Sequence, residues 1–236
     1  MTTKEDISNF YDDYSQRQIR IGANERLISL YKRLLKLGLK TDCRVLELGC
    51  GVGIFTKLLS RKISKGIIEA VDLSEKSVNI GKKYLNKKNV VFKKDDVVHY
   101  KPQYSDFDFI TLLDVIEHIP MEEHGNLFKN LGKIATEKTQ ILINIPNPQL
   151  IEYYRQHSPE ELQVIDQAIY LFPLMQHIEN ENFEIVYFEK YSIWKIEDYH
   201  VMVLRKKRKF ELKNRFDRKT ILQKIKGRIS RKYWNR

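Results

Sequence analysis

The chain is poor in cysteine and lacks any long apolar run, and these two absences exclude several classes of protein. It has only Cys43 and Cys50, with no C-x-x-C pair and no histidine cluster at ligand spacing. This argues against a disulfide framework or a structural zinc, so we expect buried, reduced thiols and no metal. No run approaches the roughly 20 apolar residues of a membrane-spanning helix, and no apolar N-terminal stretch follows a basic start. We therefore expect a cytoplasmic protein.

Charge is unevenly distributed along the chain. The net charge is +11, yet residues 205–236 hold 15 Lys or Arg against only Glu211 and Asp217. This leaves 27 basic and 29 acidic residues in residues 1–204, a net charge of −2. With 42% apolar residues the body can bury a core. We therefore divide the chain into an N-terminal helical lid (1–40), a main domain (41–204) and a polybasic tail (205–236).

Hydrophobic periodicity predicts alternating helices and strands. Apolar residues from Glu25 to Leu37 fall on one helix face, which ends near Gly38. We expect strands at seven apolar runs: Arg44–Leu48, Gly66–Val71, Val90–Lys93, Phe107–Leu112, Gln140–Ile145, Phe183–Tyr191 and Tyr199–Leu204. Helical or loop segments separate the first five, whereas a short link joins the last two. The pattern predicts an α/β fold with a mostly parallel seven-stranded sheet between two helical layers and one antiparallel edge hairpin.

A longer segment, about residues 149–180, is inserted between the fifth and sixth apolar runs. Within it, Ser158, Pro159 and Glu161 match a capping box with proline at the first helical position. The sequence therefore predicts a helix that starts at Ser158 and runs toward Tyr170.

The first predicted strand runs into a glycine-rich turn, in the sequence VLELGCGVGIF. Gly49, Gly51 and Gly53 allow a tight turn whose backbone a ligand can touch, with the following helix pointing its N-terminus at it. The spacing G-x-G-x-G differs from the dinucleotide fingerprint G-x-G-x-x-G. Glu47 precedes the turn, and a carboxylate there suits a cationic amino group better than a pyrophosphate. A lone turn of this kind can also be a simple strand-to-helix connection.

Further acidic side chains follow the next three predicted strands. Asp72 falls 19 residues after Gly53, where an acidic residue can bind ribose hydroxyls. Asp95 and Asp96 follow the third strand, where one carboxylate can meet the exocyclic amine of a base, and we interpret Asp95 as its solvated neighbour. After the fourth strand, Asp114 and Glu117 can also act simply on the dipole of a following helix.

In combination, these motifs resemble the class I (Rossmann-like) S-adenosylmethionine-dependent methyltransferases over roughly residues 45–204. The resemblance implies S-adenosyl-L-methionine as cofactor, S-adenosyl-L-homocysteine as product, and the edge hairpin as a family feature. It implies that the cofactor is bound by Glu47, Gly49, Cys50, Gly51, Gly53, Asp72, Leu73, Asp96, Val97 and Leu113. Within the family, the chain looks most like enzymes of small molecules such as quinones and sugars, rather than those of RNA, DNA or protein.

A hydroxyl acceptor usually requires a base in addition to the cofactor. His118 follows the fourth predicted strand on the cofactor side, and histidine readily accepts a proton near neutral pH. The alternative is a histidine that caps or packs the next helix, and His124 is a weaker second candidate. An amine acceptor needs no base. We expect the lid and the insertion to cover the acceptor, with Tyr14, Arg20 and Tyr154 in contact with ligand.

The tail allows three interpretations. Ile221, Leu222, Ile225, Ile229 and Tyr233 recur at helical spacing among basic residues, which is typical of a helix on an anionic membrane surface. Such a helix would place the protein at the inner membrane face, near a lipid-linked acceptor. Nucleic acid is a less favoured partner for the same charges, and a plain basic extension or a helix that docks on another protein remains open.

The sequence thus predicts a methyltransferase that acts on a hydroxyl or amine of a small or lipid-linked acceptor. The alternatives are an RNA-associated methyltransferase and a catalytically silent protein that binds the cofactor only. An NAD-dependent oxidoreductase would need the longer glycine fingerprint, which the chain lacks.

Overall fold

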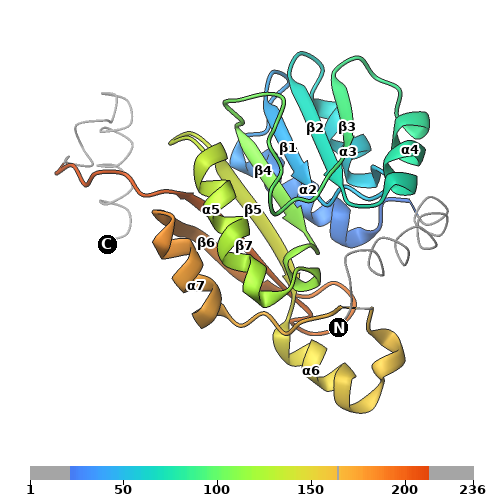
Figure 1. Cartoon of the computed structure of the whole chain (residues 1–236), viewed down its shortest axis with the longest axis vertical. Coiled ribbons are helices and arrows are strands. Elements are labelled where there is room, and N and C mark those ends of the chain that lie inside the picture. The colour runs from blue at the N-terminus through green and yellow to red at the C-terminus, as the bar shows by residue number, and fades with distance from the viewer. Residues whose placement is uncertain (1–21, 164, 213–236) are drawn as a thin grey trace, which may run out of the picture.

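A twisted seven-stranded sheet forms the centre of the computed structural model, which describes residues 22–163 and 165–212 (Figure 1). Its strand order is β3-β2-β1-β4-β5-β7-β6. The strands are β1 (Arg44–Leu48), β2 (Ile67–Asp72), β3 (Val90–Lys94), β4 (Phe109–Leu113), β5 (Gln140–Pro146), β6 (Phe183–Tyr191) and β7 (Tyr199–Lys206). Strands β1 to β5 pair in parallel, and β7 is antiparallel to β5 and to β6. The mostly parallel sheet and its antiparallel hairpin are therefore confirmed, with strand bounds shifted by at most two residues.

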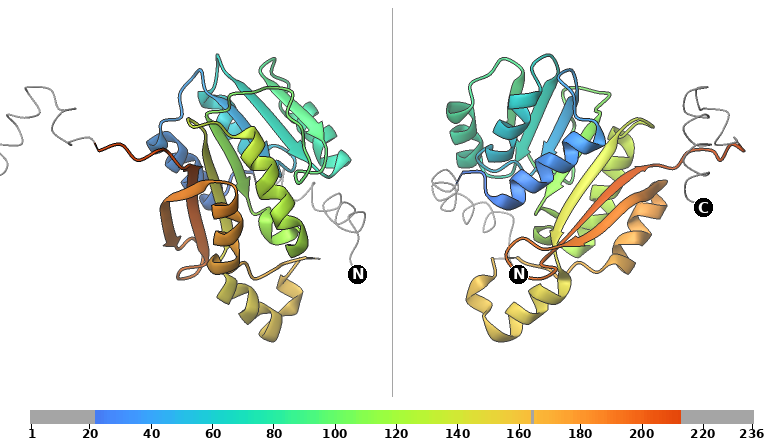
Figure 2. Two further views of the ribbon diagram at one scale, coloured as in Figure 1. Left: turned by 60° about the vertical axis from the view of Figure 1, so that its left-hand side comes forward. Right: turned by 180° about the vertical axis from the view of Figure 1, so that it is seen from behind.

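Helices cover both faces of the sheet. α2 (Glu25–Leu37), α3 (Ile54–Lys62) and α4 (Glu75–Tyr84) lie on one face, and α5 (His124–Ile134) and α7 (Leu171–Asn180) lie on the other (Figure 2). α6 (Pro148–His157) lies beyond the end of the sheet (Figure 1). The expected three-layer α/β architecture is confirmed. Because both faces are buried, the central strands are apolar nearly throughout rather than alternating.

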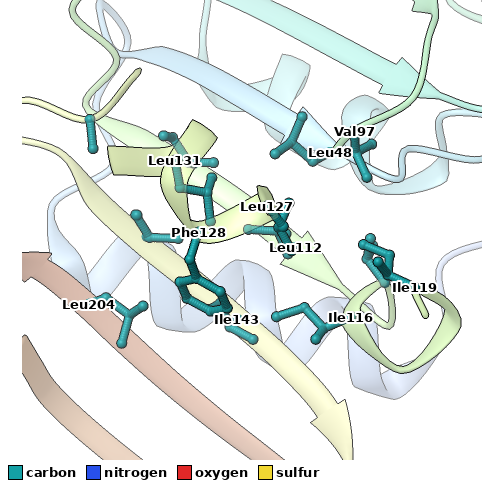
Figure 3. Close-up of a cluster of buried hydrophobic side chains, with 14 of the residues drawn as sticks. Leu48, Val97, Leu112, Ile116, Ile119, Leu127, Phe128, Leu131, Ile143 and Leu204 are labelled. Carbon is teal, nitrogen blue, oxygen red and sulfur yellow. The ribbon is translucent and has the colours of Figure 1, made fainter. Parts of the chain in front are cut away.

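The larger core lies between the sheet and α5. Leu112 and Ile143 from neighbouring strands meet Leu127 and Phe128 of α5, and all four side chains are buried (Figure 3). Fully burying a Leu or Phe side chain contributes about 1.5–3 kcal/mol each. This packing holds the carboxyl ends of β4 and β5, and the loops that follow them, in a defined position.

α2 belongs to the packed body rather than to a separate lid. Asn24 caps its first turn by accepting a hydrogen bond from the Leu27 amide (3.0 Å), and Gly38 ends it in the left-handed region. Leu30 and Leu34 are buried in the core that α3 and β1 share. The prediction of a helix here is confirmed, but only its first turn reaches the region beyond the strand ends. Residues 1–21, with Tyr14 and Arg20, lie outside the described residues.

The insertion after β5 differs from its predicted form. α6 begins one residue after Asn147, whose side chain accepts from the Gln149 amide (3.0 Å), with proline at the first position. Ser158 ends α6 and makes no side-chain capping bond, so only the short 3₁₀ helix η3 (Pro159–Glu161) follows it. The predicted helix toward Tyr170 is therefore wrong. The capping-box pattern is local, whereas the segment after η3 is held by the loop after β4: the Gln167 amide donates to the Glu117 carbonyl (3.1 Å), and Nδ1 of His118 lies 2.5 Å from the Ile165 carbonyl oxygen.

The tail leaves the fold at the edge of the sheet where the parallel strands begin. Leu204 pairs with Ile141 near the start of β5, and Lys206 pairs with Phe183 at the start of β6. The glycine turn, in contrast, follows the carboxyl end of β1. No helix among the described residues has the length and apolarity that a membrane span requires. Residues 213–236, which hold the predicted amphipathic helix, lie outside the described part of the chain.

Candidate active site

A cavity of about 400 Å³ lies at the carboxyl ends of β1, β2 and β4. Such a volume is within the range of small-molecule sites, about 300–1,000 Å³. The first turn of α2, the loop after β4, and the loop between β6 and β7 complete its wall. The lining includes most of the predicted site residues: Glu47, Gly49, Cys50, Gly51, Asp72, Leu73, Asp96, Val97, Leu113 and His118.

The glycine turn is shaped by backbone constraints at its first two glycines. Gly49 has φ 79° and Gly51 has φ 52°, a region that favours glycine. A Cβ atom at Gly49 would lie 2.3 Å from Cγ2 of Val115, so no side chain fits there. The Gly51 amide donates to Oδ2 of Asp72 (2.7 Å). The turn is thereby tied to the end of β2, with its backbone exposed to the cavity.

Gly53 has a different role from the one predicted. It does not line the cavity but precedes α3 with φ 83°, and a Cβ atom there would lie 2.7 Å from the Phe92 ring of β3. In this structure, the third glycine therefore allows α3 to start close to the sheet. The sequence could not distinguish this packing role from ligand contact, because both favour glycine.

Glu47 places a buried carboxyl group at the base of the cavity. It accepts a hydrogen bond from the Thr56 hydroxyl of α3 (2.7 Å). Burial raises the pKa of Glu47 from its ordinary value of 4.5 to about 8, against the opposing effect of the Thr56 hydrogen bond. The adjacent Cys50 is a buried free thiol, as expected, and burial raises its pKa as well. The cavity therefore contains an acidic group that lacks a cationic partner among the described residues.

Two further carboxylates lie at the ends of β2 and β3. Asp72 also accepts from the Ser74 amide through Oδ1 (2.9 Å), and Asp96 accepts from the Val98 amide (3.0 Å). These bonds orient both side chains at the cavity wall. Asp95 is exposed and does not line the cavity, in agreement with its interpretation as a solvated neighbour.

A buried polar network behind the cavity was not predicted. Arg26 of α2 forms an ion pair with Asp114, which accepts from the Asn144 amide (2.7 Å), and Asn144 in turn accepts from the Tyr191 hydroxyl (2.6 Å). Arg26 and Asp114 both line the cavity. The available signal was the position of Arg26 four residues before the buried Leu30, on the inward stripe of α2.

The segment after β4 forms short 3₁₀ turns, η1 (Ile116–His118) and η2 (Met121–Glu123), before α5 begins. Asp114 and Glu117 therefore do not flank the N-terminus of an α-helix, and the proposed dipole role is not supported. Glu117 is fully buried, and neither carboxyl oxygen has a hydrogen-bond partner among the described residues. Burial, followed by the nearby Asp114, raises its pKa well above the usual range, which favours a neutral carboxylic acid.

His118 lies at the cavity wall and contacts the inserted segment. Its Nδ1 atom is 2.5 Å from the Ile165 carbonyl oxygen and 3.2 Å from Oδ1 of Asp166. Both partners are acceptors, so Nδ1 carries the hydrogen and the lone pair of the neutral ring is on Nε2. Burial raises the pKa of Asp166, and His118 opposes that shift. Sequence reasoning did not find Asp166, which is 48 positions from the histidine it orients.

Two other predicted residues do not line the cavity. Tyr154 on α6 accepts a hydrogen bond from the Lys195 ammonium (2.5 Å), outside the cavity wall. His124 is buried at the start of α5, where Nε2 contacts the Ile116 and Ile119 carbonyls (3.1 and 2.9 Å). The lid-side wall is formed by Asn24, which belongs to the predicted lid, and by three residues that were not predicted, namely Gln163, Trp194 and Tyr199.

Comparison with known proteins identifies related sequences. Residues 16–203 match a family model described as a methyltransferase domain. A malonyl-[acyl-carrier protein] O-methyltransferase of Bacillus anthracis is 36% identical over 87 residues, which is 37% of this chain and 31% of that protein. A ubiquinone biosynthesis O-methyltransferase of Coxiella burnetii is 22% identical over 152 residues, 64% of this chain and 60% of that one. The matched segment thus spans about a third of the first relative and less than two thirds of the second.

The fold also matches solved structures. Magnesium protoporphyrin IX methyltransferase of Synechocystis, crystallised with S-adenosylhomocysteine, superposes with a TM-score of 0.68 at 15% identity, over 86% of this chain and 99% of that one. At this identity the match concerns the fold.

Proposed function

The chain belongs to the methyltransferase domain family, and from this membership we propose that it transfers a methyl group from S-adenosyl-L-methionine to a small apolar acceptor. The observation that carries the proposal is the convergence of Glu47, the glycine turn, Asp72 and Asp96 on one cavity. A hydroxyl is the acceptor group that we favour, with an amine as the alternative.

The charge of the cavity lining fits this cofactor. Among the described residues of the lining, Arg26 is the only Lys or Arg, whereas Glu47, Asp72, Asp96, Asp114 and Glu123 are carboxylates, and Asp114 is paired with Arg26. S-adenosylmethionine carries an ammonium, ribose hydroxyls and an adenine amine, which match the carboxylates of Glu47, Asp72 and Asp96, and a carboxylate that Arg26 can bind beside its pairing with Asp114. A dinucleotide would bring a pyrophosphate to the glycine turn, beside Glu47 and Asp72. The donor set therefore favours S-adenosylmethionine over NAD.

Each group of the cofactor has a candidate partner. Glu47 would hold the ammonium, Arg26 the carboxylate, and Asp72 the ribose hydroxyls. Asp96 would accept from the adenine amine, with Val97 and Leu113 as apolar walls. When bound, S-adenosylmethionine supplies an activated methyl group, so the protein chiefly aligns the acceptor and excludes water.

His118 would act as the base for a hydroxyl acceptor. Because Nδ1 donates toward Ile165 and Asp166, Nε2 is the atom that accepts the proton. The charge that His118 gains is then stabilised by the Asp166 carboxylate, and general base catalysis of this kind contributes about 10²–10⁴-fold. Asp166 is a positioning residue in this scheme, since it acts through the histidine.

The acceptor side of the cavity favours an apolar molecule. Trp194 lines the cavity and is 57% exposed, and Ile196 in the same loop is 92% exposed. Related proteins are named for O-methylation in ubiquinone biosynthesis and for magnesium protoporphyrin IX, and the exposed side chains support a similarly apolar acceptor here. A lipid-linked acceptor is a second candidate on the same observation.

Label transfer tests the proposal. The protein is incubated with methyl-labelled S-adenosylmethionine and host extract separated into lipid, soluble-metabolite and RNA fractions. We expect label in the metabolite or lipid fraction and a loss of about 10²–10⁴-fold in rate for His118→Ala, the usual contribution of a general base. Asp166→Asn should lower the rate and change its pH profile while leaving cofactor affinity unchanged.

Other outcomes would separate the alternatives. Label in RNA alone would favour an RNA-associated enzyme. Tight binding of S-adenosylhomocysteine by calorimetry, with no label in any fraction, would indicate a silent cofactor-binding protein. Absence of binding would contradict the assigned cofactor, and Asp72→Ala with unchanged affinity would contradict the ribose assignment.

A further inference from the structure

The ends of α2, α3 and α4 carry a continuous set of basic side chains, which we call the basic rim. All three helices run toward the edge of the sheet where the parallel strands begin, opposite the cavity. The last turn or following loop of each helix contributes Lys or Arg side chains, which are exposed except for the half-buried Lys62. The basic rim comprises Lys36, Lys40, Arg61, Lys62, Lys65, Lys82, Lys83, Lys87 and Lys88.

Hydrogen bonds between the loops join the rim into one surface. The Thr41 carbonyl, next to Lys40, accepts from the amides of Ser64, Lys65 and Gly66 (3.0, 2.8 and 3.0 Å). The Asn89 side chain donates to the Ile63 and Gly66 carbonyls (3.1 and 3.3 Å), and Lys87 donates to the Ser60 carbonyl (2.9 Å). The three loops are therefore adjacent and fixed relative to one another.

Neighbouring carboxylates balance little of the positive charge of the rim, since Asp42 is the one Asp or Glu in the loop between α2 and β1 (residues 38–43). Residues 54–68 and 76–94 contain no Asp or Glu. Within the described residues, no ion pair involves a side chain of the rim. Because residues 1–204 have a net charge of −2, this concentration of positive charge requires an excess of acidic residues elsewhere on the body. The rim is thus a localised positive surface, which attracts anionic partners.

The polybasic tail begins at the same edge of the sheet. β7 ends at Lys206 beside the starts of β5 and β6, and Lys207, which pairs with Glu179, Arg208 and Lys209 follow in sequence. Further along, Phe210 and Leu212 are 86% and 93% exposed. The described start of the tail and the rim therefore add their charge on one side of the molecule, away from the cavity, and Phe210 and Leu212 add apolar groups.

Anionic phospholipid is the partner that this chemistry fits. The rim is nearly all lysine, whose compact ammonium interacts as a point charge, whereas arginine is the residue of bidentate phosphate recognition. No exposed aromatic ring lies in the rim segments, residues 36–65 and 82–88, although base stacking is the usual means of holding single-stranded nucleic acid. We propose that the basic rim, together with the described start of the tail (residues 207–212), binds the anionic surface of a phospholipid membrane, with the cavity edge facing the aqueous phase.

Vesicle co-sedimentation of the full chain tests this inference independently of methyl transfer. The probes are vesicles of phosphatidylcholine alone and of phosphatidylcholine with phosphatidylserine. We expect binding to the anionic vesicles only, lost at high salt. Each lysine near such a surface contributes about 1 kcal/mol, so Lys65→Glu with Lys88→Glu should reduce partitioning by about 30-fold or more.

A variant of equal charge provides the matched control. Lys129→Glu with Lys190→Glu changes the same number of exposed lysines away from the rim and should retain most of the binding. Equal losses in the two variants would mean that net charge alone is responsible and would overturn the inference. Wild-type binding by the rim variant would overturn it too, as would rim-dependent binding of an RNA oligonucleotide without vesicle binding. Unchanged circular dichroism and cofactor affinity would exclude misfolding.

Discussion

At the scale of single residues, the protonation state of the buried Glu47 carboxyl group links pH to both ligand binding and protein stability. Its pKa is raised from 4.5 to about 8 in the folded protein. Between these values the folded state keeps the proton that the unfolded state loses. The free energy of unfolding therefore falls as pH rises through this window. A ligand ammonium placed beside Glu47 would reverse the shift and release the proton.

We predict that S-adenosylmethionine binds with release of a proton between pH 5 and about 8, so that its affinity rises with pH and levels off above about 8. Glu47→Gln should lose this release and weaken binding by about 10–100-fold, since a hydrogen bond to a charged group contributes about 1.5–3 kcal/mol. Calorimetry in buffers of different ionisation enthalpy measures both effects. Asp95→Asn, at an exposed position, is the control. Equal proton release by wild type and Glu47→Gln would exclude Glu47 as the source.

Arg26, Asp114 and Asn144 come from three separate parts of the fold and form one polar network. Asp114 is held at φ 55°, an uncommon conformation for a residue other than glycine. Its carboxylate bridges Arg26 of α2 and Asn144 of β5. The same contacts that connect the elements also position Arg26, the only guanidinium among the described residues that line the cavity.

At the scale of elements, the start of α3 depends on the absence of a side chain at Gly53. This glycine joins the turn to the helix with φ 83°, and the Phe92 ring of β3 lies against its Cα. The Phe92 ring also lies against Gly81 of α4. The three elements therefore approach one another around a single aromatic ring.

We predict that Gly53→Ala destabilises the protein by about 2–4 kcal/mol, from backbone strain plus overpacking against Phe92. Gly38→Ala provides the comparison. It also has positive φ, at 107°, but no atom lies within 4 Å of the added Cβ, so we expect only the backbone cost of about 1–2 kcal/mol. Urea denaturation measures both values. An equal loss of unfolding free energy in the two variants would show that the contact with Phe92 adds no destabilisation beyond the backbone cost.

The segment from Asp114 to Glu123 is an element that local signals did not describe. Its acidic residues suggested a helix start, but two 3₁₀ turns precede α5. These turns place His118 against Ile165 and Asp166. Their conformation depends on contacts with the insertion, which no local pattern contains.

At the scale of the whole molecule, the two edges of the sheet at which the parallel strands begin and end carry side chains of opposite charge. The carboxyl ends carry the cavity with its carboxylates, and the opposite edge carries the basic rim and the start of the tail. The division follows from the α/β fold, in which loops after the strands form sites and helices end at the opposite edge.

We predict that cofactor binding and the rim are energetically independent. S-adenosylmethionine at 100 times its dissociation constant should stabilise the folded protein by about 2.7 kcal/mol, in the wild type and in the Lys65→Glu, Lys88→Glu variant alike. Thermal denaturation with and without cofactor measures the difference. A smaller increase in Tm for the rim variant would indicate coupling between the two edges.

The strands, the antiparallel hairpin, the glycine turn and most of the cavity carboxylates could be predicted from the sequence, because burial periodicity and backbone constraints are local properties. The contacts of Arg26 with Asp114 and of His118 with Asp166, and the assembly of the basic rim from three helix ends, could not. Each joins residues far apart in the chain, and their proximity depends on how the helices pack on the sheet. The packing role of Gly53 and the failed helix after Ser158 have the same cause, since tertiary contacts of Gly53 with Phe92, and of residues 165–167 with Glu117 and His118, outweigh the local pattern.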